Sequence, residues 1–248
     1  MTGFSYQLYS SRNFPPLGDT LAMLAAAGYA SVEGFGGVYA DPAALAAALK
    51  ANGLTMPTGH FSIDQLESDV PGVLAIAKAV GMTHIYCPYI MPDQRPADAA
   101  GWKAFGARLQ AASAPYKAAG YGFGWHNHDF EFVALPDGST PQDQIFAGGP
   151  ELEWEADIAW IVRGGADPLA WIAKYGQRIT SVHVKDIAAK GQNLDEDGWA
   201  DLGQGTVDWK SIMAALRGTP CKTFVMEHDN PSDHKRFATR SIAAAKGL

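Results

Sequence analysis

Short apolar runs alternate with alanine- and leucine-rich runs along this 248-residue sequence, and this alternation limits the fold more than any other feature. Short apolar runs bounded by turn residues are typical of buried strands, whereas the longer alanine-rich runs are typical of helices. The predicted strands are 4–9, 31–35, 54–59, 84–88, 121–126, 152–157, 179–184 and 222–227. The predicted helices are 17–27, 42–51, 68–80, 98–118, 141–147, 167–175, 208–216 and 232–246.

These strand–helix units predict an α/β fold that closes into a single (β/α)8 TIM barrel, with residues 1–248 as one domain. A doubly wound open sheet is the main alternative, and it usually carries a glycine-rich phosphate loop after its first strand. Here the first strand is followed by SSRNFPPLGD, which lacks such a loop. The barrel is therefore the favoured fold.

Residues that begin and end helices support these boundaries. Several glycines end an alanine-rich segment just before an apolar run, where glycine supplies the left-handed residue that closes a helix. They are Gly28, Gly53, Gly81 and Gly120. Aspartates that precede predicted helices are expected to be N-caps. They are Asp41, Asp167 and Asp208.

Charge and hydropathy exclude several kinds of partner. The net charge is −7 and no run of lysine and arginine occurs, so the sequence disfavours nucleic acid and a DNA-repair endonuclease activity. No apolar stretch is long enough to span a membrane, and the N-terminus lacks the features of a secretory signal. We therefore expect a cytoplasmic protein with buried free thiols at Cys87 and Cys221. A homo-oligomer is compatible with this composition.

The residues that carry chemistry in a (β/α)8 barrel lie at the carboxyl ends of the strands. Polar residues that gather there are Glu33, His60, His126, His128, Glu131, Asp157, His183, Lys185 and Glu227. Carboxylates and imidazoles are costly to crowd together unless a cation lies between them. The sequence therefore predicts one divalent metal ion, and mixed oxygen and nitrogen ligands suit Mn²⁺, Mg²⁺, Co²⁺, Fe²⁺ or Zn²⁺.

The main candidate ligands also have structural interpretations. Asp157 alone would be a helix cap or an ion-pair partner, and His183 alone would be a hydrogen-bonded core residue. Glu227 ends an apolar strand, where capping does not explain it. Taken together, the three positions favour a shared metal site.

Six segments carry a family resemblance: VEGF (32–35), WHNHDFEF (125–132), ADIAWIVRGGADP (156–168), ITSVHVKD (179–186), DLGQGTVDW (201–209) and VMEHDNP (225–231). In this order they resemble the sugar phosphate isomerase/epimerase family of xylose isomerase-like TIM barrels over nearly the whole chain. The resemblance implies a metal-dependent enzyme of carbohydrate metabolism that acts on a small sugar-like substrate.

The resemblance also implies metal ligands of the types Glu, Asp, His and Glu at the ends of the fifth to eighth strands. Asp157, His183 and Glu227 match the last three positions. At the first position the sequence reads WHNH (125–128) in place of the usual glutamate. Glu131 is the expected ligand there, and a histidine of the WHNH segment is the alternative.

By the same resemblance, the enzyme is expected to remove a proton next to a carbonyl and to pass through an enediolate, as a sugar isomerase or epimerase. Glu227 is the first expected acid/base residue, and Glu131, His126 or His128 is the second. Lys185 would hydrogen-bond a substrate oxygen or pair with Asp157 or Asp186. The alternative is a lyase or dehydratase with the same enolate chemistry, resembling an inosose dehydratase or a lyase of 3-keto-glycosides.

The expected substrate-binding residues are Glu33, His60, Trp125 and Trp160. Core packing explains the two tryptophans equally well. A non-catalytic sugar-binding protein is a weaker hypothesis, because it would not need four residues of metal-binding type.

Overall fold

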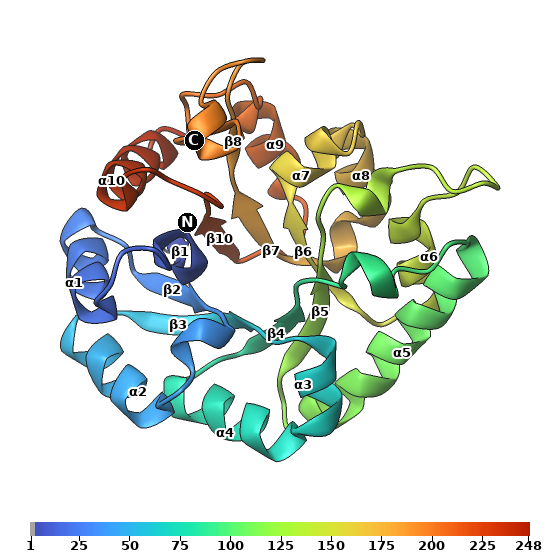
Figure 1. The fold of residues 1–248 in the computed structure, drawn as a ribbon, viewed down its shortest axis with the longest axis horizontal. Helices are drawn as coiled ribbons and strands as arrows, with labels where there is room; N and C mark the ends of the chain where they lie inside the picture. Colours follow the sequence, from blue (N-terminus) through green and yellow to red (C-terminus); the bar gives the residue numbers. More distant parts are fainter. Residues whose placement is uncertain (1–2) are drawn as a thin grey trace.

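Parallel strands close into a barrel in the computed structural model, which describes residues 3–248 (Figure 1). The eight barrel strands in this part of the chain are β1 (Ser5–Gln7), β2 (Ser31–Gly34), β3 (Thr55–His60), β4 (His84–Cys87), β5 (Gly122–His126), β6 (Glu153–Asp157), β7 (Ile179–Val184) and β10 (Thr223–Met226). Their order around the ring is β1-β10-β7-β6-β5-β4-β3-β2, and β1 pairs in parallel with both β2 and β10. The predicted (β/α)8 barrel is confirmed.

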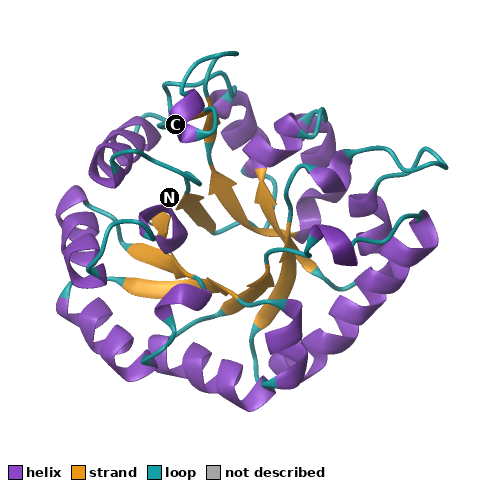
Figure 2. Ribbon diagram, in the orientation of Figure 1, coloured by secondary structure: helices purple, strands orange, loops and turns teal. Residues whose placement is uncertain are grey.

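Helices surround the strands on the outside of the barrel (Figure 2). They are α1 (Leu17–Ala27), α2 (Pro42–Ala51), α3 (Ile63–Ser68), α4 (Val70–Val80), α5 (Ala99–Ala118), α6 (Pro141–Gly148), α7 (Ile158–Arg163), α8 (Pro168–Tyr175), α9 (Trp209–Leu216) and α10 (His234–Ala245). Within residues 3–248, every helix is too short or too polar to cross a membrane. Cys87 and Cys221 are buried and free, as predicted.

The predicted helix boundaries agree with the observed ones where a cap marks them. Gly28 ends α1 at φ 97°, a left-handed conformation that glycine adopts without strain. The other three glycines of the prediction also have positive φ. Asp41 accepts a hydrogen bond from the backbone N–H of Ala44, and Asp167 and Asp208 cap their helices in the same way.

Several short elements differ from the prediction. The helix predicted over 68–80 corresponds to α4, which Asp69 caps through the N–H of Gly72, whereas α3, just before it, was not predicted. The helix α7 and an antiparallel pair, β8 (Asp186–Ile187) with β9 (Trp199–Ala200), were not predicted. Such short elements contain too few residues to show a hydrophobic period.

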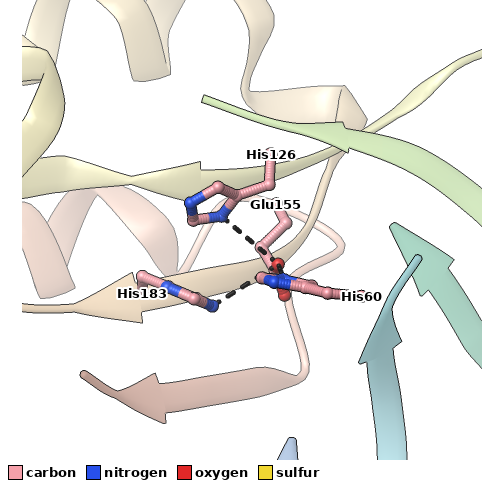
Figure 3. Close-up of side chains that lie close together, drawn as sticks. All are labelled: His60, His126, Glu155 and His183. Carbon is pink, nitrogen blue, oxygen red and sulfur yellow. Dashed lines mark hydrogen bonds and ion pairs between the residues drawn. The ribbon is translucent and has the colours of Figure 1, made fainter. Parts of the chain in front are cut away.

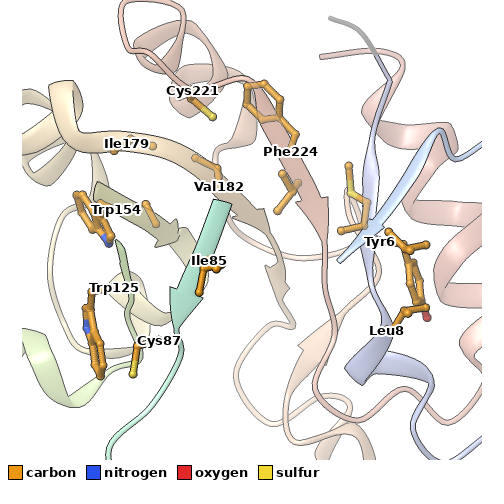
Figure 4. Packing of buried hydrophobic residues seen from close by; sticks show 14 of the residues in the cluster. Tyr6, Leu8, Ile85, Cys87, Trp125, Trp154, Ile179, Val182, Cys221 and Phe224 are labelled. Carbon is orange, nitrogen blue, oxygen red and sulfur yellow. The ribbon is translucent and has the colours of Figure 1, made fainter. Parts of the chain in front are cut away.

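The apolar core lies mainly between the strands and the helices (Figure 4). Trp125 of β5 packs edge-on against Phe105 of α5, with ring centroids 5.3 Å apart. Side chains of a strand alternate between its two faces, so the next residue, His126, points into the barrel. The barrel interior therefore receives polar side chains from strands whose outer faces are apolar.

Candidate active-site pocket and metal centre

A pocket of about 570 Å³ opens at the carboxyl ends of the strands. It is lined by Tyr9, Phe35, His60, Pro88, Tyr89, Arg95, His126, His128, Asp129, Trp160, Glu227 and Asp229. A second pocket, of about 460 Å³, is lined by residues that include Cys221 and Lys222, just before β10, and so lies at the opposite end of the barrel. Because the polar strand-end residues gather around the first pocket, it is the candidate active site.

Three candidate ligands meet at the base of this pocket, and we call them the triad: Asp157, His183 and Glu227. One ligand atom of each lies within 4.8 Å of the others, and all three side chains are buried. The Nδ1 atom of His183 lies 2.8 Å from Glu227 Oε2 and 3.9 Å from Asp157 Oδ2. The three residues come from the ends of the neighbouring strands β6, β7 and β10, as the sequence predicted.

Asp157 caps a helix and is also a candidate metal ligand, so both roles that the sequence left open are compatible. Its Oδ1 atom accepts a hydrogen bond from the N–H of Trp160 at 2.9 Å and caps α7. Its Oδ2 atom is buried and has no hydrogen-bond partner. Burial raises the pKa of Asp157 to about 7, although the Lys185 ammonium acts in the opposite direction. The Oδ2 atom of Asp157 is therefore available to bind a cation held by the triad.

Lys185 neutralises part of the negative charge around the triad. Its Nζ atom lies 2.5 Å from Asp229 Oδ2, 3.2 Å from Glu227 Oε2 and 3.6 Å from Asp157 Oδ2. Burial alone would raise the pKa of Glu227, but Lys185 and His183 together hold that pKa well below its usual range. Glu227 is therefore a carboxylate at neutral pH, and Lys185 pairs chiefly with Asp229.

The two histidines of the WHNH segment line the pocket beside the triad. Burial, and next the nearby His183, lower the pKa of His126 to about 3. Burial also holds the pKa of His128 well below its usual value. The His128 ring lies edge-on to Tyr89, at 4.9 Å between centroids, and 5.2 Å from the ring of Trp160. Both histidines are thus neutral imidazoles that can bind a metal or accept a proton.

His60 and His183 also contact two further buried carboxylates, Glu33 and Glu155, the second of which is drawn in Figure 3. His60 Nε2 lies 2.5 Å from Glu155 Oε2 and 3.2 Å from Glu33 Oε1. His183 Nε2 lies 2.7 Å from the same Glu33 oxygen. Glu33, predicted to bind substrate, is fully buried and does not line the pocket, whereas His60 and Trp160, predicted in the same role, lie on the pocket wall.

Glu155 was missed in the sequence. The signal for it was present, because Glu155 precedes Asp157 by two residues on β6 and so faces the same side of the strand.

The structure places Glu131 and Trp125 away from the pocket, which corrects two expectations. Glu131 Oε1 accepts a hydrogen bond from Trp125 Nε1–H at 3.0 Å, and Oε2 accepts one from the His128 N–H at 2.9 Å. Trp125 faces the helix layer because its neighbour on β5 faces the barrel interior. Glu131 therefore supports the turn after β5, and His126 is the strand 5 residue that reaches the candidate ligands.

We expect Glu131→Gln to leave the metal dissociation constant within about twofold of wild type, because neither carboxylate oxygen faces the triad. It should lower the free energy of unfolding by about 1 kcal/mol through one weakened buried hydrogen bond. Asp157→Asn is the matched control and should weaken metal binding by about 10- to 100-fold. Metal titration and urea unfolding measure both effects. Equal losses of metal affinity in the two variants would restore Glu131 as a ligand.

Comparison with known proteins identifies the family. The family model described as xylose isomerase-like TIM barrel matches residues 21–246, and the chain therefore belongs to this family. Its members are mostly enzymes, among them isomerases or epimerases and a dehydratase. No curated protein matches the chain.

Solved structures share this fold along nearly their whole length. A sugar phosphate isomerase/epimerase from Parabacteroides distasonis ATCC 8503 has a TM-score of 0.82 at 19% identity, covering 98% of this chain and 93% of that one. The IolI protein with a bound zinc atom has a TM-score of 0.77 at 14% identity, covering 99% and 96%. The probable 3-DHS dehydratase AsbF from Bacillus anthracis has a TM-score of 0.74 at 14% identity, covering 99% of both chains. At these identities the likeness shows the fold alone.

Proposed function

We propose that this chain is a divalent-metal-dependent sugar isomerase or epimerase that removes a proton from the carbon next to a carbonyl. The observation that carries the proposal is the triad, which places two carboxylates and an imidazole at the base of a pocket. One of these carboxylates, Glu227, also lies on the pocket wall, where it can meet a substrate.

The triad fits a divalent cation. Asp157 Oδ2 is buried without a hydrogen-bond partner, and two carboxylates with one imidazole suit the first-row metals and Mg²⁺. The bound zinc of the IolI structure agrees with this assignment. When bound, the ion would act as a Lewis acid that stabilises negative charge on a substrate oxygen.

Two residues on the pocket wall can accept the substrate proton. Glu227 is a carboxylate held by His183 and Lys185. His128 is neutral, and its Nδ1 atom has no hydrogen-bond partner. A base and a second group that returns the proton are what isomerisation or epimerisation through an enediolate requires.

The remaining pocket wall suits a sugar-like ligand. Aromatic rings of Tyr9, Phe35, Tyr89 and Trp160 offer faces to C–H groups, and Arg95, Asp129 and Asp229 offer hydrogen bonds to hydroxyls. The Tyr9 and Phe35 rings pack edge-on to one another, 5.3 Å apart, so this wall is already ordered. A substrate with many hydroxyls and an apolar ring face would use both kinds of residue.

A lyase or dehydratase acting through the same enolate is the second candidate. The observation that favours it is the pair His126 and His128, which supplies imidazoles on the pocket wall in addition to Glu227. β-Elimination needs one group to take the proton and another to protonate the leaving group. The name of the dehydratase AsbF is consistent with such chemistry on this fold.

The test is turnover of ketoses, inososes and 3-keto-glycosides by protein stripped with chelator and by the same protein reloaded with Mn²⁺. We expect one substrate class to react, with a rate about 10³-fold lower in the stripped protein, because several kcal/mol of charge stabilisation are lost. Metal content is measured on both samples. Undiminished turnover in protein shown to be free of metal would refute the proposal.

A further inference from the structure

A second group of potential ligands adjoins the triad and includes Glu155, which lies one inward position deeper on β6 than Asp157. We call this group the deep quartet: His60, His126, Glu155 and His183. One ligand atom of each lies within 4.8 Å of the others, and all four residues are buried. Figure 3 shows the three imidazole rings arranged around the Glu155 carboxylate. The triad and the deep quartet share His183, whose Nδ1 faces the triad and whose Nε2 faces Glu155.

The charges around the deep quartet are not balanced by basic side chains. Glu33 and Glu155 are both fully buried, and among residues 3–248 their ion-pair partners are histidines alone. Each keeps one oxygen without a hydrogen-bond partner, Oε2 of Glu33 and Oε1 of Glu155. Lys185 forms its ion pairs with Asp229 and with the two carboxylates of the triad, and not with Glu33 or Glu155. Two buried carboxylates with unpartnered oxygens and no Lys or Arg beside them favour a bound cation as the source of positive charge.

We propose that the deep quartet is a second cation site, with His60 Nε2, His126 Nδ1, Glu155 Oε2 and His183 Nε2 as ligands. With both sites filled, His183 would bridge them as an imidazolate, since both of its ring nitrogens would have given up their protons to bind metal. This proposal concerns metal binding and stands independently of the proposed reaction.

The spacing of the ligand atoms agrees with a tetrahedral site. Metal–ligand bonds of about 2.0–2.2 Å place tetrahedral ligand atoms about 3.4 Å apart. Glu155 Oε2 lies 3.3 Å from His126 Nδ1 and 3.4 Å from His183 Nε2. Its 2.5 Å contact with His60 Nε2 is a hydrogen-bond distance, and a cation would replace that proton and separate the two atoms.

The two sites should prefer different metals. Three imidazoles and one carboxylate suit Zn²⁺, Co²⁺ or Ni²⁺ and disfavour Mg²⁺ and Mn²⁺, which prefer oxygen. The triad offers two carboxylates and one imidazole, so it accepts Mn²⁺ as well as Zn²⁺. We therefore expect the chain to bind about two Zn²⁺ ions but about one Mn²⁺ ion.

Elemental analysis of the full chain, saturated with Zn²⁺ or with Mn²⁺ and then desalted, tests this assignment. His60→Gln removes a ligand of the deep quartet alone, so it should retain about one Zn²⁺ and one Mn²⁺. Asp157→Asn removes a ligand of the triad alone, so it should retain about one Zn²⁺ and lose Mn²⁺. His84→Gln, which changes a histidine at the opposite end of the barrel, should match wild type.

Saturation of the wild-type chain at one Zn²⁺ would overturn the second site, whatever the variants do. So would two bound Zn²⁺ ions that persist in folded His60→Gln and Glu155→Gln, where circular dichroism establishes folding. The stoichiometry is independent of turnover, so a failure to find a substrate would count against the proposed function without affecting this assignment.

Discussion

Glu227→Gln is expected to lower kcat/KM by about 10³-fold or more, because the carboxylate is both a ligand of the triad and a proton acceptor on the pocket wall. The amide cannot accept the substrate proton, and it weakens the contacts at 2.8 Å with His183 Nδ1 and at 3.2 Å with Lys185 Nζ. Steady-state kinetics at saturating Mn²⁺ measure the loss, and metal titration separates weaker metal binding from slower proton transfer.

Glu153→Gln is the matched control for this prediction. Glu153 begins β6 at the opposite end of the barrel, where its Oε2 lies 3.5 Å from His84 Nε2. The substitution makes the same chemical change far from the pocket, so kcat/KM should stay within about twofold of wild type. Wild-type turnover by Glu227→Gln would exclude Glu227 from the reaction.

Much of the fold was predictable because the hydrophobic periods of strands and helices can be read directly from the sequence. The alternation of apolar and alanine-rich runs gave the eight barrel strands, and caps such as Asp41 and Gly28 fixed helix ends through local hydrogen bonds. Helix α3 was missed because its six residues are too few to show a helical period. The β8–β9 pair was missed because two residues show no alternation.

The position of a strand end predicted which side chains come together, but not their directions in turns. Asp157, His183 and Glu227 follow strands that are neighbours in the barrel, so their proximity follows from topology. Glu131 lies in a short 3-10 turn after β5, where spacing from the strand does not determine which way a side chain points. Its carboxylate accepts a hydrogen bond from Trp125, and nothing in the sequence indicates this contact.

The polar interior of this barrel was the least predictable feature. The inward polar side chains come from several strands, and Glu33 of β2 contacts His183 of β7 although 150 residues separate them in the sequence. Glu155 alternates with Glu153 and Asp157 along β6, and this spacing places it on the inward face without indicating which side chains it contacts there. Pairings of this kind depend on how the ring of strands closes, and a single sequence does not encode that register locally.

Deuterium incorporation in D2O is the second large expected effect, and it is the most direct test of enolate chemistry at the triad. If Glu227 or His128 removes a proton next to a carbonyl, a base open to solvent will exchange it before it returns. Mass spectrometry on parallel reactions with a ketose and a 3-keto-glycoside should show deuterium at that carbon with no loss of mass, as an isomerase or epimerase requires. Loss of water or of an alcohol would instead support the lyase or dehydratase.

The decisive sample is protein shown by elemental analysis to hold a divalent metal, with Glu227→Gln run beside it. We expect deuterium in the product of the wild-type chain, and at most a trace with Glu227→Gln or after chelation. Neither deuterium nor loss of mass from any substrate of the panel, with the metal in place, would contradict it.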